Sequence, residues 1–122
     1  MEENNHKIYD LKKRSYIYAL ETIKFLEDLP KDYISQTIGR QLLRSATSIG
    51  ANIIEAQASS SRKDFTNFYS HSLKSANESK FWFSLLLDSH RVPADKTKVI
   101  FEETIELSNI LASSILKLKG KK

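Results

Sequence analysis

The 122-residue chain contains no cysteine, only two prolines and only three glycines. Without cysteine it has neither disulfide bonds nor thiolate metal ligands, which is compatible with the cytoplasmic location that we expect. So little proline and glycine is atypical of a many-turned β protein and favours a few long elements. The hydrophobic runs, such as 81–83 and 85–87, are far shorter than a membrane span. The polar, acidic start of the chain does not resemble a signal peptide.

Outside the C-terminal tail the chain has no excess of charge of either sign. The chain has 19 lysines and arginines against 15 aspartates and glutamates, a net charge of +4. Four lysines in the basic tail 117–122 account for this excess, and residues 1–116 are neutral overall. Because a terminal lysine cluster is more often solvated than bound, charge alone is weak support for a nucleic-acid partner.

What the sequence does have is helical periodicity. Three short breaks, at 29–32, 59–61 and 90–93, separate stretches in which apolar residues recur every three or four positions. This pattern predicts four helices, at about 9–29, 33–58, 62–89 and 94–118. Short connections favour antiparallel neighbours, so we expect one domain over 1–122, an all-α, antiparallel up-down four-helix bundle.

Two details of the helices can be predicted. The first helix is expected to bury an apolar face, widened by two further residues, Phe25 and Leu29; the face is composed of Tyr16, Ala19, Leu20, Ile23 and Leu26. Ser61 is expected to cap the third helix, because a carboxylate follows it three residues later.

Residues 44–56 combine helical spacing with small and polar side chains. An apolar line of Ile49, Ile53 and Ala56 runs beside a polar line of Arg44, Ser48, Asn52 and Glu55. We interpret Arg44, Asn52, Glu55 and Glu78 as a structural polar network. In it, a glutamate meets Arg44 or Arg40 across a helix pair and Asn52 bonds a loop or a helix end. The alternative, an active acid, needs a second titratable group with a defined task, and none is identifiable.

Catalytic and metal-binding patterns are missing. A di-metal bundle needs two Glu-x-x-His motifs, and the only match is Glu3-Asn4-Asn5-His6. No arginine lies four to six residues before a histidine, as it does in helical ribonucleases of the HEPN type. There is no glycine-rich phosphate loop or Gly-x-Ser-x-Gly elbow. We therefore predict no enzyme, no metal and no cofactor, and interpret His71 and His90 as surface or capping residues.

Three consecutive aromatic residues, Phe81, Trp82 and Phe83, cover nearly the whole circumference of the third helix. Such a segment is expected to be buried on more than one side, which predicts a subunit interface.

Three segments together resemble a known family. They are Arg44-Ser45-Ala46-x-Ser48-Ile49-x-Ala51-Asn52-Ile53-x-Glu55-Ala56, Ser61-Arg62-Lys63-Asp64-Phe65-x-x-Phe68 and Leu73-x-Ser75-x-x-Glu78-x-x-x-Trp82. They are similar to the bacterial four-helix-bundle proteins encoded in 23S rRNA intervening sequences, whose relatives include accessory variability proteins of diversity-generating retroelements. The similarity extends over about residues 8–118.

The resemblance implies a bundle that assembles into a homo-oligomeric ring, a homopentamer, without a catalytic centre. For the retroelement relatives it also implies a basic surface that binds structured RNA or DNA, and a reverse-transcriptase partner. The charge-balanced body of this chain departs from that pattern.

Three hypotheses follow for function. The first is a non-enzymatic oligomeric scaffold that binds nucleic acid, RNA above all, by phosphate contacts from Lys12, Lys13, Arg14, Arg62, Lys63, Lys117, Lys119, Lys121 and Lys122. The second is a protein-interaction module without a nucleic-acid role. An enzyme is the third and least favoured.

Overall fold

The computed structural model describes residues 11–120. In this part of the chain all regular structure is helical. The helices are α2 (Leu11–Glu27), α3 (Tyr33–Gln57), α4 (Arg62–Asp88) and α5 (Ala94–Leu118). The end of α2 and both ends of the other three helices lie within two residues of the predicted positions. The predicted first residues of the first helix, 9–10, lie outside the described residues.

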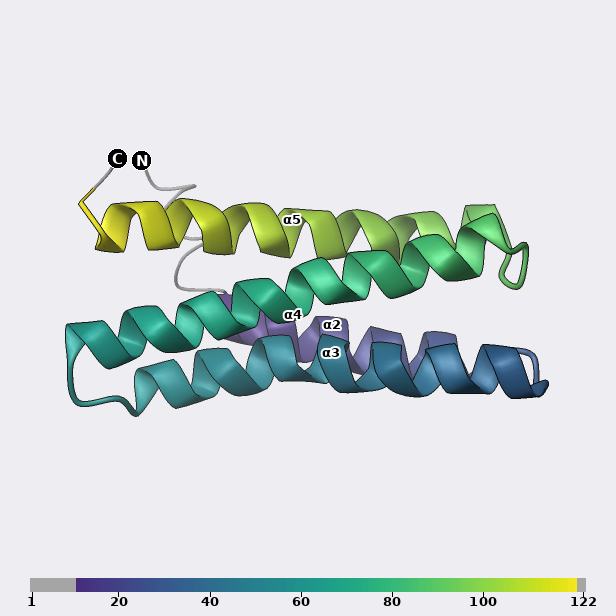
Figure 1. Ribbon diagram of the computed structural model, residues 1–122, viewed down its shortest axis with the longest axis horizontal. Coiled ribbons are helices and arrows are strands. Elements are labelled where there is room, and N and C mark those ends of the chain that lie inside the picture. Colours follow the sequence, from purple (N-terminus) through teal and green to yellow (C-terminus); the bar gives the residue numbers. More distant parts are fainter. Residues whose placement is uncertain (1–10, 121–122) are drawn as a thin grey trace.

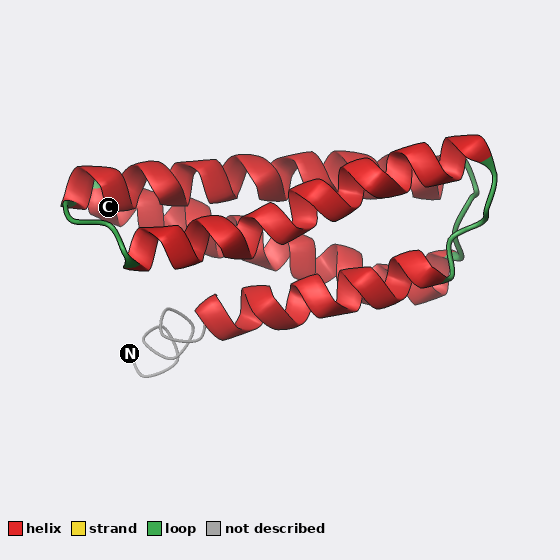
Figure 2. Cartoon of the chain, turned by 90° about the horizontal axis from the view of Figure 1, so that it is seen from below, coloured by secondary structure: helices red, strands yellow, loops and turns green. Residues whose placement is uncertain are grey.

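The helices lie alongside one another and are joined by short loops at the two ends of the bundle (Figures 1 and 2). Contacts are most extensive between α3 and α4, then between α4 and α5 and between α2 and α3, and they are less extensive between α2 and α5. Consecutive helices are antiparallel, as expected from the short connections. The end of α3, the start of α4 and the end of α5 therefore meet at one end of the molecule.

Side-chain caps fix the starts of α3 and α4. The Asp32 carboxylate accepts a hydrogen bond from the Ser35 backbone nitrogen at 3.1 Å and begins α3. Hydrogen bonding with the side chain and the backbone of Ser35, reinforced by the nearby Arg91 guanidinium, lowers the pKa of Asp32. At α4 the Ser61 hydroxyl oxygen accepts from the Asp64 nitrogen at 3.0 Å, which confirms the predicted N-cap.

The bundle core mixes large apolar side chains with paired hydroxyl groups. Leu42, Ile49, Ile53 and Leu107 are fully buried. Between α3 and α4 the packing is close, because small residues face one another there. The hydroxyl groups of Ser45 and Ser79 bond at 2.7 Å, and Ser72 Oγ donates to the Ile49 carbonyl at 2.8 Å. Buried hydroxyl groups are tolerated because each has such a partner.

The predicted apolar face of the first helix is only partly confirmed: Leu29 is buried and Phe25 and Leu26 pack against the core, but three other residues do not. Tyr16, Leu20 and Ile23 are exposed, with 66%, 47% and 42% of their surface accessible. The buried residues of α2 are Leu11, Ser15, Tyr18 and Thr22. Helix α2 thus buries hydroxyl groups in the core and leaves an apolar stripe, among charged residues, on its solvent-facing side.

Candidate functional site

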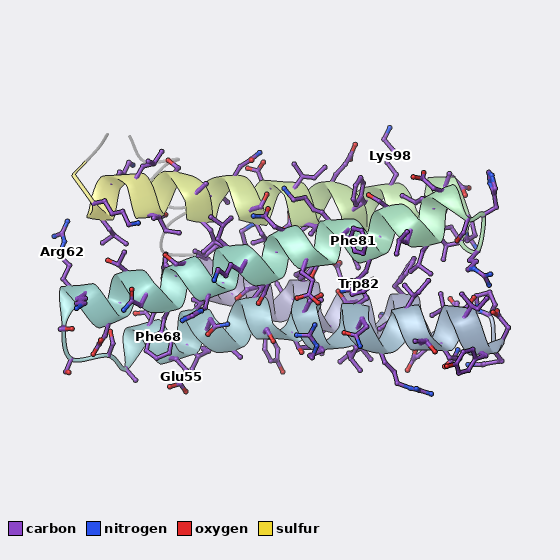
Figure 3. The ribbon with its side chains drawn as sticks, in the orientation of Figure 1. Glu55, Arg62, Phe68, Phe81, Trp82 and Lys98 are labelled. Carbon is purple, nitrogen blue, oxygen red and sulfur yellow. The ribbon has the colours of Figure 1, made fainter. Side chains whose placement is uncertain are left out.

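The basic residues predicted to contact nucleic acid gather mainly at the end of the bundle where α4 begins and α5 ends. Lys63, Lys117 and Lys119 are exposed there. Arg62 joins the two helices, since its Nε and Nη2 atoms donate to the Leu118 carbonyl at 3.2 and 2.9 Å. We call this group of four residues the basic end, and Figure 3 shows Arg62 at its tip. Lys121 and Lys122 lie outside the described residues.

Both arginines predicted to contact nucleic acid are engaged within the chain. Arg62 bonds one of the otherwise unpaired carbonyls at the end of α5, a favourable position for a cation. Arg14 binds both carboxylate oxygens of Glu103 on α5, at 3.1 and 2.8 Å. This bidentate ion pair is half-buried and links α2 to α5, two helices with few other contacts. The structure therefore gives Arg14 a bundle-stabilising contact.

Lys12 and Lys13 lie at the start of α2, beside a surface groove of about 620 Å³ between α2 and α3. The rest of the groove is lined by small or apolar side chains and by Tyr16: Ser15, Tyr16, Ala19, Thr47, Gly50, Ala51 and Ile54. Gly50 permits the close approach of the helices here, because a Cβ atom on it would lie 3.2 Å from Ser15 Oγ. The groove is thus an apolar surface with two cations at one end.

The residues of the predicted polar network are only partly brought together. Arg44 and Glu78 form an ion pair between α3 and α4, and the same carboxylate oxygen, Oε2, accepts from Trp82 Nε1 at 2.9 Å. Asn52 instead donates to the Ser48 carbonyl within its own helix, at 2.9 Å. Glu55 is exposed, and Figure 3 shows it pointing away from the bundle. The arrangement holds two helices together and positions an indole ring.

The three consecutive aromatic residues of α4 have different environments. Phe83 is fully buried in the chain's own core, against Phe25 and Phe101. Trp82 is partly buried and bonded to Glu78. Phe81 is 56% exposed and packs edge-on against Trp82 (Figure 3). Of the three, Phe81 offers most surface to a partner and Phe83 offers none.

Other kinds of site find little support within residues 11–120. No group of three or more histidine, aspartate or glutamate side chains there is placed to hold a metal ion. His71 and His90 are exposed, and His90 ends α4 with a φ of 59°. In the same range no helix is long and apolar enough to cross a membrane.

Sequence reasoning missed the groove and the outward apolar face of α2. A signal for both was present, because Tyr16, Leu20 and Ile23 recur at helical spacing. That spacing shows that residues share a face but not whether the face packs inside one chain or against another. Leu43, Thr47, Ala51 and Ile54 give α3 a second stripe of the same kind, outside its core-facing line.

The fold and its surfaces define a small four-helix-bundle protein of the all-α class. Residues 7–113 match the family of 23S rRNA-intervening sequence proteins, and the chain belongs to this family. A crystal structure of a protein of unknown function from the S23 ribosomal protein family of Bacteroides thetaiotaomicron is similar to it. The two share 33% identity and a TM-score of 0.83, over 89% of this chain and 97% of the other. Comparison with curated proteins gives no match.

Proposed function

We propose that this protein is a non-enzymatic, oligomeric helical scaffold of the cytoplasm that binds structured RNA through its basic end. The observation that carries the proposal is the gathering of Lys63, Lys117 and Lys119 around Arg62, which topology brings together from α4 and α5. Exposed lysines bind phosphate groups without reading sequence. Family membership agrees with an RNA-related role, because the family is named after intervening sequences of 23S rRNA.

Assembly is the second part of the proposal. A ring, a homopentamer as the resemblance implies, repeats the basic end once per subunit. Several weak phosphate contacts on one RNA molecule then act together, and the effective concentration of each further contact is high. The charge-balanced body of a single chain is compatible with RNA binding on these terms. A reverse transcriptase, the partner of the retroelement relatives, is a candidate protein for the same scaffold.

Filter binding to a structured RNA across a salt series tests RNA binding. We expect the logarithm of affinity to fall linearly with the logarithm of salt concentration, because phosphate contacts release counterions. The triple variant Lys63→Gln/Lys117→Gln/Lys119→Gln is expected to bind at least about tenfold more weakly and with a shallower salt slope. The matched control is Lys31→Gln/Lys96→Gln/Lys98→Gln, which removes the same charge at the opposite end.

Equal losses in the two triple variants would show that net charge, not the basic end, drives binding. Absence of binding at 50 mM salt would remove RNA as a ligand.

The second candidate function, a protein-interaction module, is favoured by the apolar groove between α2 and α3. A partner protein that stays bound after nuclease treatment of the lysate, together with no direct RNA binding, would support it.

A further inference from the structure

A surface pocket of about 420 Å³ lies within the basic end. It is bounded by the end of α3, the loop that follows, the start of α4 and the last residue of α5. Arg62 and Leu118, which join α4 to α5 by hydrogen bonds, both line it. Pockets of roughly 300–1,000 Å³ are the size in which proteins hold small organic groups.

Two polar side chains that line the pocket have no hydrogen-bond partner among residues 11–120. They are the carboxamide of Gln57, at the end of α3, and the hydroxyl group of Ser60, in the loop, and both residues are exposed. The neighbouring serines differ, because Ser59 Oγ donates to the Ala56 carbonyl at 2.6 Å and Ser61 caps α4. Gln57 and Ser60 can therefore offer donor and acceptor groups to a ligand.

The pocket also has two flat surfaces. The guanidinium group of Arg62 is held in one orientation, because its Nε and Nη2 atoms donate to the same Leu118 carbonyl. Phe65 is half-buried, and its ring stacks on Tyr69 with centroids 4.6 Å apart and an angle of 27° between the planes. Proteins stack unpaired RNA bases on aromatic rings and guanidinium planes, and polar side chains then bond to the base edges.

The three exposed lysines of the basic end are neighbours in sequence of the residues that line this pocket. Lys63 follows Arg62, and Lys117 and Lys119 lie on either side of Leu118. A nucleotide whose base occupies the pocket therefore has its phosphate groups close to these cations. The pocket and the phosphate-binding lysines form one continuous surface.

We propose that this pocket takes one unpaired base of the bound RNA. Phe65 and Arg62 stack on the base, and the Gln57 carboxamide bonds to its edge. The basic end then prefers RNA with a bulged nucleotide to a fully paired helix, because a paired base leaves its stack only at a cost in free energy. The inference rests on the RNA binding proposed above and names the feature of the RNA that is recognised.

Three RNA duplexes of the same sequence test the pocket: one fully paired, one with a single bulged nucleotide, and one with an abasic residue at the bulge. The abasic duplex retains the phosphate and the flexibility of the bulge but lacks the base. We expect the bulged duplex to bind about tenfold more tightly than the other two, a gain typical of stacking one base on an aromatic side chain. The salt dependence of binding is expected to be the same for the bulged and abasic duplexes, because they have equal numbers of phosphates.

Two variants of the pocket test the assignment to residues. Phe65→Leu and Gln57→Ala are each expected to weaken binding of the bulged duplex severalfold and to leave binding of the paired duplex unchanged. The matched controls are Phe68→Leu, which changes a half-buried aromatic residue of the same helix, and Asn67→Ala, which removes an exposed carboxamide of α4. Neither control residue lines the pocket. Circular dichroism checks that each variant remains helical.

The outcomes separate this inference from the proposed function. Equal affinity for the bulged and abasic duplexes, with binding still weakened in the lysine triple variant, would overturn the pocket and leave RNA binding at the basic end standing. A preference for the bulged duplex that survives both Phe65→Leu and Gln57→Ala would overturn the assignment to this pocket. Absence of binding to all three duplexes at about 50 mM salt would withdraw both proposals.

Discussion

The phenol of Tyr18 lies fully buried in the core with its hydroxyl group paired. Thr104 Oγ1 donates to the Ile100 carbonyl at 2.8 Å, so it accepts the Tyr18 hydroxyl hydrogen at 2.7 Å. Burial disfavours the charged phenolate and raises the pKa of Tyr18 to about 12. Ionisation of this residue is therefore coupled to unfolding.

At alkaline pH this coupling predicts a loss of stability. The neutral phenol is favoured in the folded chain, so its contribution is complete below pH 10 and is lost as pH rises toward 12. The free energy of unfolding is expected to fall by up to about 3 kcal/mol over this range from Tyr18 alone. In the Tyr18→Phe variant the free energy of unfolding is expected to fall less over this range. At pH 7 this variant is expected to be about 1 kcal/mol less stable than the original chain. Urea unfolding at several pH values measures both, and coincident pH profiles would contradict the assignment.

At the scale of single residues, the sequence was sufficient to name the cations but not their partners. Arg14 meets Glu103, 89 positions away, and Arg62 meets Leu118, 56 positions away. Such pairings depend on which helices become neighbours and at what height. The Arg44–Glu78 pair was within the predicted alternatives because both residues were expected to lie near the seam between two adjacent helices.

At the scale of helices, periodicity predicted α3 well and α2 poorly. The core-facing line of α3, with Ile49, Ile53 and Ala56, is buried as the spacing indicates. In α2 the buried side has hydroxyl groups, and a prediction based on hydrophobic residues alone does not assign serine and threonine to the core. Ser15 and Thr22 are nevertheless easily buried, because each donates to a backbone carbonyl of its own helix, at 2.9 Å in both cases.

A glycine at position 90, just after the end of α4, is expected to stabilise the chain. His90 adopts a φ of 59°, in the left-handed region that costs a residue with a side chain about 1 kcal/mol. Helices often end on glycine in this conformation. His90→Gly is therefore expected to raise the free energy of unfolding by up to about 1 kcal/mol. Thermal unfolding at pH 7 measures the change, with Ser89→Gly as a neighbouring control; a clear destabilisation by His90→Gly alone would contradict the expectation.

At the scale of the whole molecule, the two proposed functions occupy different surfaces. The basic end carries exposed lysines from α4 and α5, whereas the apolar groove lies between α2 and α3. A protein bound in the groove leaves the basic end accessible. A variant defective in one surface is therefore expected to retain the other.

The central claim is that the chain works as an assembly of several copies, which repeats the basic end. Sedimentation equilibrium at micromolar concentration and moderate salt tests it most directly. We predict a mass that is a multiple of the 14.0 kDa chain. A mass of one chain would contradict the account.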